Sequence, residues 1–186
     1  LITVYAIGSE LKYGTSRHLM KTAGGSIVKA LAGKMAVYTL IFTVLGITLE
    51  LLLYHWLHYP IKGSIWWMFV DILLLVAAAQ AVGMFIIGLF PNLRLAVSVS
   101  AIYSVLGFSL AGFTLPVEAM MPALRDFSAI FPLRHYYLFY VQEAIFGSGF
   151  AGWWQQAVSL LIFLGLPLTV VRRLEDAYIH VRYERD

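Results

Sequence analysis

Four long apolar runs constrain this chain most, because each is long enough to cross a lipid bilayer. They are residues 35–54, 66–90, 95–115 and 153–171, and the carboxylates inside them are Glu50 and Asp71. A helix needs roughly 20 apolar residues to span the hydrocarbon core. The sequence shows no alternation of apolar and polar residues of the kind that indicates β-strands. The runs therefore predict an all-α fold, a polytopic bundle of transmembrane helices.

The composition supports an integral membrane protein. Hydrophobic residues make up 61% of the chain and charged residues 12%, with a mean hydropathy of +0.81. A soluble domain carries about 25% charged residues. The absence of cysteine excludes a disulfide framework and a thiolate site. The net charge of +3 does not indicate nucleic acid, because membrane proteins gather lysine and arginine on their cytoplasmic side. Lipid is the expected surrounding.

The lysines and arginines also predict an orientation. Most of them precede the first run, separate the second run from the third, or follow the fourth, so these parts are expected to be cytoplasmic. Residues 1–9 are too short to span and are interpreted as the end of a truncated transmembrane helix, which makes the chain a C-terminal fragment. Residues 174–186 are expected to form a cytoplasmic tail, and residues 112–147 to lie outside.

Residues 112–147 are too polar and too rich in proline to be a simple span. Pro116, Pro122 and Pro132 each stop or kink a helix, and aromatic residues crowd the second half of the segment. Such a mixture is typical of short helices at a membrane interface, where aromatic rings lie among the headgroups. We expect an extracytoplasmic re-entrant or interfacial segment. It is either a gate that moves or a rigid brace for the spans.

Residues 10–34 form a second unusual stretch, on the expected cytoplasmic side. Leu19 and Ile27 belong to a set of apolar residues at helical spacing, while basic residues occupy other faces. This pattern is typical of an amphipathic helix lying on anionic lipid. It equally suits a helix that docks on a soluble partner, and periodicity does not separate the two.

Together the two stretches resemble the membrane subunit of an ABC-2 type transporter, with a type V exporter-like fold. The first stretch matches the family's cytoplasmic coupling motif, in order, at Glu10, Lys12, Gly14, Thr15, Leu19, Thr22, Gly33 and Lys34. The second matches the family's later signature at Gly112, Pro116, Met121, Pro122, Leu124, Pro132, Tyr136 and Gly147. The chain departs from the family in having Ala23 where proline is usual, and in lacking the first span and most of the second.

The resemblance implies a permease in a bacterial inner membrane, acting as an exporter with a second permease copy, identical or related. A cytoplasmic ATP-binding subunit would dock on residues 10–34, with coupling assigned to Glu10, Lys12, Gly14, Thr15 and Leu19. ATP hydrolysis would belong to that partner, in agreement with the absence of a glycine-rich phosphate loop from this chain. No cofactor is expected. Candidates for the translocation path or its outer gate are Pro116, Met121, Pro122, Pro132, Tyr136, Glu50 and Asp71.

Glu50 and Asp71 admit more than one interpretation. Antiparallel neighbouring helices joined by a short loop would bring them to a similar depth. Ionisable residues inside a membrane commonly have a function, so the two acids could line a cavity or pair with Lys62 or a nearby histidine. Alternatively, both are close enough to the surface to be hydrated. Gln80, nearer the middle of its run, is expected to form a hydrogen bond between helices.

Catalytic and metal sites are not predicted. His55 and His58 stand three residues apart, but no third ligand completes a zinc site nearby. No serine or threonine has a recognisable paired base. The alternatives to a permease are a non-transporting membrane protein whose residues 10–34 form a lipid-bound anchor, and an intramembrane enzyme that uses Glu50 and Asp71.

Overall fold

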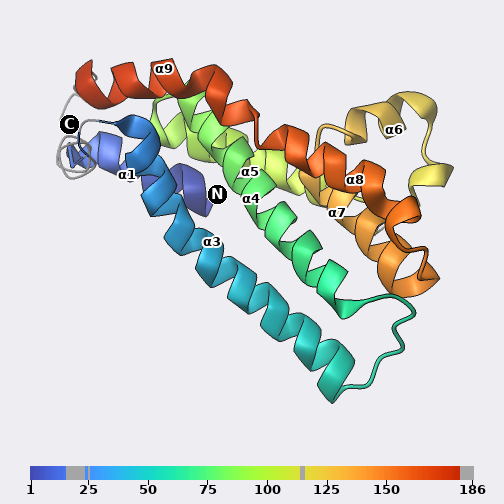
Figure 1. Cartoon of the computed structure of the whole chain (residues 1–186). Coiled ribbons are helices and arrows are strands. Elements are labelled where there is room, and N and C mark those ends of the chain that lie inside the picture. Colours follow the sequence, from blue (N-terminus) through green and yellow to red (C-terminus); the bar gives the residue numbers. More distant parts are fainter. Residues whose placement is uncertain (16–23, 25, 114–115, 181–186) are drawn as a thin grey trace. The chain divides into compact units, whose positions relative to one another are not determined.

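The computed structural model describes residues 1–15, 24, 26–113 and 116–180, and every regular element in this part of the chain is helical (Figure 1). The predicted all-α fold is therefore confirmed. The chain divides into two compact units, each built from separate stretches of sequence. The first comprises Leu1–Tyr38, Gln80–Ser104 and Leu164–Asp186, and the second comprises Thr39–Ala79 and Val105–Phe163.

Among the described residues, three helical stretches are long and apolar enough to cross a membrane. Ile27–Trp56 combines α3 (Ile27–Leu51) with a π-helical turn, η1 (Leu52–Trp56). Ile65–Leu89 is α4, and Phe150–Tyr178 includes α8 (Phe150–Phe163) and most of α9 (Leu166–His180). The run at residues 95–115 contributes a shorter apolar helix, α5 (Leu93–Ser109), of 17 residues.

The first unit is built on the second half of α4. Here α1 (Ile2–Tyr13) and α9 both pack closely on α4, because glycines stand at the contacts. A Cβ atom at Gly83 would lie 2.9 Å from the Cβ of Thr3, and one at Gly88 would lie 2.6 Å from Val170 Cγ2. The amide of Gln80 donates to the carbonyl of Met35 at 3.5 Å, so the predicted hydrogen bond between helices is confirmed.

The second unit contains the remainder of α3 and α4 and the proline-rich segment. That segment forms a short 3-10 turn, η2 (Val117–Ala119), then α6 (Pro122–Ser128), α7 (Pro132–Tyr140) and a π-helical turn, η3 (Val141–Phe146). Pro122 and Pro132 are the first residues of their helices, where a missing N–H group costs nothing.

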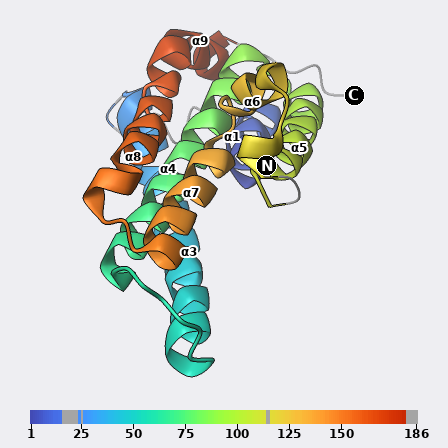
Figure 2. The ribbon, with the colours of Figure 1, turned by 90° about the vertical axis from the view of Figure 1, so that its right-hand side faces the viewer.

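Helices α7 and α8 lie side by side in both views of the ribbon (Figures 1 and 2). Phe139 of α7 stacks on Trp153 of α8 with ring centroids 4.3 Å apart, and Trp67 of α4 lies 4.7 Å from the same tryptophan. Aromatic packing therefore joins α4, α7 and α8 into one core, which holds the proline-rich segment against the helices that precede and follow it.

Candidate functional site

Three helices of the first unit meet at the carboxylate of Glu10. Lys34 of α3 forms an ion pair with Glu10 Oε1 and also donates to the carbonyl of Ala6 at 2.6 Å. The hydroxyl of Tyr178, on α9, donates to Glu10 Oε2 at 3.0 Å. The side chains of Glu10 and Lys34 are only 14% and 18% exposed, so water screens this pair weakly. The two ends of the stretch 10–34 are thus joined at one point.

The other predicted coupling residues lie beyond this point. Lys12 and Thr15 are exposed, and the Lys12 ammonium lies 5.6 Å from the centroid of the Tyr13 ring. Gly14 ends α1 in a left-handed conformation with φ of 70°, which glycine adopts without strain. Leu19 is outside the described residues. The structure therefore turns Glu10 inward and leaves Lys12 and Thr15 on the surface.

Glu50 and Asp71 are buried in the second unit, with 6% and 1% of their surface exposed. In the described part of the chain, none of their four carboxylate oxygens has a hydrogen-bond partner. Pairing with Lys62 or a nearby histidine is therefore not seen there, and the small exposure does not fit the alternative of hydration at the surface. Both acids are instead enclosed by the helices of this unit.

Within the proline-rich segment, Tyr136 interacts with these acids. Its pKa is raised above the usual value, first by burial and then by the charges of Asp71, Glu50 and Tyr140. The hydroxyl of Tyr140 is hydrogen-bonded to that of Tyr54 in η1. The structure thus brings together three of the predicted path residues, Glu50, Asp71 and Tyr136.

The other predicted gate residues are spread over the proline-rich segment. Pro116 and Pro122 are exposed and Pro132 is buried. Met121, which precedes α6, is 73% exposed and is available to contact another molecule. These residues define the boundaries of short helices rather than a single cluster.

Glu143 was not singled out from the sequence, yet it holds the loop between η1 and α4 in place. Its buried carboxylate accepts hydrogen bonds from Ser64 N at 2.7 Å and from Trp153 Nε1 at 2.9 Å. The backbone adds a bond from Lys62 N to Ala144 O at 3.0 Å. The only hint of this role in the sequence was the presence of a glutamate in an aromatic stretch shortly before Gly147. Its function is visible only through partners distant in sequence.

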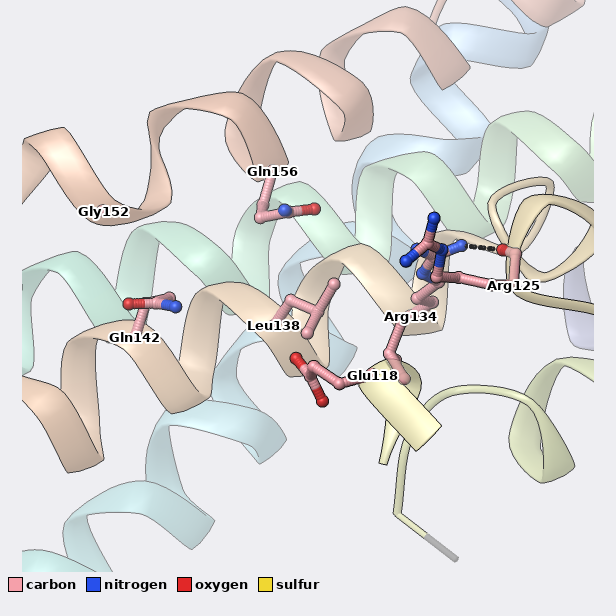
Figure 3. A pocket seen from close by; sticks show the side chains of 8 residues that line it. Glu118, Arg125, Arg134, Leu138, Gln142, Gly152 and Gln156 are labelled. Carbon is pink, nitrogen blue, oxygen red and sulfur yellow. Dashed lines mark hydrogen bonds between the residues drawn. The ribbon is translucent and has the colours of Figure 1, made fainter. Parts of the chain in front are cut away.

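A polar cavity of about 330 Å³ opens between the short helices of the proline-rich segment and α8, all in the second unit (Figure 3). Arg134 donates from Nη1 to the carbonyl of Arg125 and, at 2.7 Å, to Ser128 Oγ. Burial and the positive charge of Arg125 lower the pKa of Arg134, while Asp126 and Glu118 oppose this shift. The sequence did not predict this cavity, which is lined by Val117, Glu118, Arg125, Arg134, Leu138, Gln142, Gly152 and Gln156.

Comparison with known proteins identifies a family. The model of the family described as ABC-2 type transporter matches residues 14–143, which is more than half of the chain. No curated protein and no solved structure matches the chain. The matched residues run from the end of α1 through α3, α4 and α5 to Glu143, and so include the two buried acids and the proline-rich segment. The all-helical fold, the apolar spans and this match together show that the chain belongs to the ABC-2 type transporter family and is an integral membrane component of a transport system.

Proposed function

We propose that this chain is the permease subunit of an ATP-driven exporter in a bacterial inner membrane. Two permease copies form the translocation path, and a separate ATP-binding subunit docks on the stretch 10–34. ATP is bound and hydrolysed by that partner, and the permease converts the partner's movement into movement of its helices. The family match supports the role of membrane permease. Export, the dimer and the coupling to ATP are our proposal.

The contacts of Glu10 are the observation that carries the coupling. A docking stretch transmits force only if its ends are attached to the helices that must move. Glu10 and Lys34, at the two ends of the stretch, are bonded to each other, and Tyr178 adds α9 to the same carboxylate. Both oxygens of Glu10 are engaged within the chain. We therefore assign Glu10 to anchoring the stretch, and the exposed Lys12, Gly14 and Thr15 to contact with the partner.

At the outer side, we assign the proline-rich segment to closing the path. Its short helices begin at Pro122 and Pro132, and Tyr136 approaches Glu50 and Asp71 on the helices beneath. Separation of α7 from α3 and α4 would open this region to water. The exposed Met121 is positioned to meet the second copy.

The test of the coupling is a conservative substitution at the anchor. Tyr178→Phe removes a single hydroxyl from Glu10, and Tyr5→Phe is a matched control because Tyr5 is an exposed phenol on α1. In the complex reconstituted into vesicles with its ATP-binding subunit, Tyr178→Phe should lower transport per ATP hydrolysed several-fold. Tyr5→Phe should leave this ratio unchanged. Both variants should bind the ATP-binding subunit normally.

Wild-type ratios in both Tyr178→Phe and Glu10→Gln, in complexes that assemble normally, would overturn the assignment of the anchor. Purification of the chain from native membranes gives a separate test of the partner. Recovery without an ATP-binding subunit, under conditions that keep the membrane complexes intact, would instead favour a non-transporting membrane protein.

A further inference from the structure

Among the described residues, two carboxyl groups inside the spans are buried without a hydrogen-bond partner on either oxygen. Asp71 is 1% exposed and Glu50 is 6% exposed, and all four of their oxygens lack hydrogen-bond partners. An ionised carboxylate moved out of water without a partner costs several kcal/mol even after the surroundings relax. Two such groups in one interior therefore require a source of positive charge.

Close packing of α3 on α4 brings the two acids together. Gly46 lies one helical turn before Glu50 and so on the same face of α3. A Cβ atom at Gly46 would lie 2.7 Å from Cγ2 of Ile72, the residue that follows Asp71 on α4. The two carboxyl groups are close enough to interact electrostatically, so they would repel each other if both were ionised.

The groups around the pair do not supply the missing charge. Among the described residues, the other titratable groups that interact with the pair are phenols: Tyr54 in η1 and Tyr136 on α7. No lysine, arginine or histidine in this part of the chain forms an ion pair with either acid. The hydroxyls of Tyr54 and Tyr140 are bonded to each other. Phenols are neutral and cannot balance a carboxylate.

The number of ligands and the space around Glu50 and Asp71 favour a proton as the source of positive charge. A metal ion would need further ligands, but no third histidine, cysteine, aspartate or glutamate joins the pair in the described residues. An organic ammonium group would need room, whereas Asp71 is almost completely enclosed by its neighbours. A proton requires neither additional ligands nor a cavity.

We propose that Glu50 and Asp71 form a proton-binding site inside the membrane domain, and that the described arrangement is its protonated state. Separation of α3 from α4 and α7 would admit water, remove the penalty for ionisation and release a proton. The site would thereby link the opening of this unit to pH. This inference concerns the membrane domain alone, so its test needs neither an ATP-binding subunit nor a cargo.

Infrared spectroscopy of the purified full chain in lipid nanodiscs tests the proposal. A protonated carboxyl group has a carbonyl stretch that is separate from the bands of ionised carboxylates. At about pH 7 exposed aspartates and glutamates are ionised, so the band reports protected acids. We expect the band in the wild-type chain, a decrease in Glu50→Gln and in Asp71→Asn, and its loss in the double variant. Asp126→Asn, at an exposed acid of α6, is the control and should keep the band.

A chemical probe provides a measurement that requires no variant to fold. Dicyclohexylcarbodiimide partitions into membranes and adds to protonated carboxyl groups. The carboxyl oxygen bonds to the central carbon, the acid proton moves to nitrogen, and no group leaves. Mass spectrometry should find the adduct on Glu50 or Asp71 at neutral pH, in decreasing yield as the pH rises. An absent carbonyl band together with adducts confined to exposed acids such as Asp126 would overturn the proposal.

Discussion

Single polar side chains join helices that are distant in sequence, and Glu10 is the clearest case. Its ion pair with Lys34 and its bond with Tyr178 are largely shielded from solvent. Glu10→Gln should therefore lower the free energy of unfolding by about 1.5–3 kcal/mol, the usual contribution of a hydrogen bond to a charged group. Thermal unfolding in detergent measures this loss. A double-mutant cycle with Lys34→Met should show a coupling energy between the two positions, and additive effects would contradict the ion pair.

Glu143 gives a second prediction at a single position. Glu143→Gln replaces one carboxylate oxygen by an NH₂ group, which would face the N–H of Ser64 or that of Trp153. One buried donor then lacks an acceptor, and the expected cost is about 1–3 kcal/mol. Thermal unfolding again provides the measurement, together with proteolysis of the loop between η1 and α4. Faster cleavage in the variant supports the role of Glu143, and an unchanged rate with unchanged stability argues against it.

The packing of helices depends on small residues at particular contacts. Gly88→Val would place side-chain atoms against Val170 of α9, since even a Cβ atom at this position would lie 2.6 Å from Val170 Cγ2. Overpacking of this kind costs about 1–3 kcal/mol. Gly33→Ala is the control, because no atom lies within 4 Å of a Cβ atom there. The control should be neutral or stabilising by about 0.5–1 kcal/mol, the helix penalty of glycine. Equal losses in the two variants would contradict the proposed contact between α4 and α9.

The short helices of the proline-rich segment follow from local chemistry. Proline is favoured at the first position of a helix, and Pro122 and Pro132 occupy that position in α6 and α7. The sequence therefore indicated where the helices would be interrupted. It did not indicate that α7 would pack along α8 through Phe139 and Trp153, because contacts between aromatic rings depend on the path of the chain.

The proposed assembly of two copies gives a prediction about the role of the proline-rich segment. The chain has no cysteine, so Met121→Cys introduces a single thiol. If two copies meet at this segment, the variant should form an intermolecular disulfide. The crosslinking yield should differ between resting and ATP-bound complexes if the segment is a gate. Equal yields in the two states would make the segment a brace, and no crosslink in either state would place Met121 away from the interface between copies.

The class of this protein could be predicted from its amino-acid sequence. The length and apolarity of its runs predicted membrane helices, and the two motif-bearing stretches predicted the family that the family model identifies. These inferences succeed because hydrophobic length and proline position act locally, within one element. The same reasoning left the surroundings of Glu50 and Asp71 undecided, because the burial of a side chain depends on the elements that pack around it.

The contacts between particular side chains became visible when the helices were seen packed together. Glu10 is bonded to residues 24 and 168 positions further along the chain, and no local pattern connects Glu10 with Tyr178. Glu143 finds its partners in a loop 79 positions earlier and in a tryptophan 10 positions later. The isolation of the acid pair likewise results from helices of separate segments. The physical reason is that such contacts require elements remote in sequence to be packed together, and composition and periodicity carry no record of that packing.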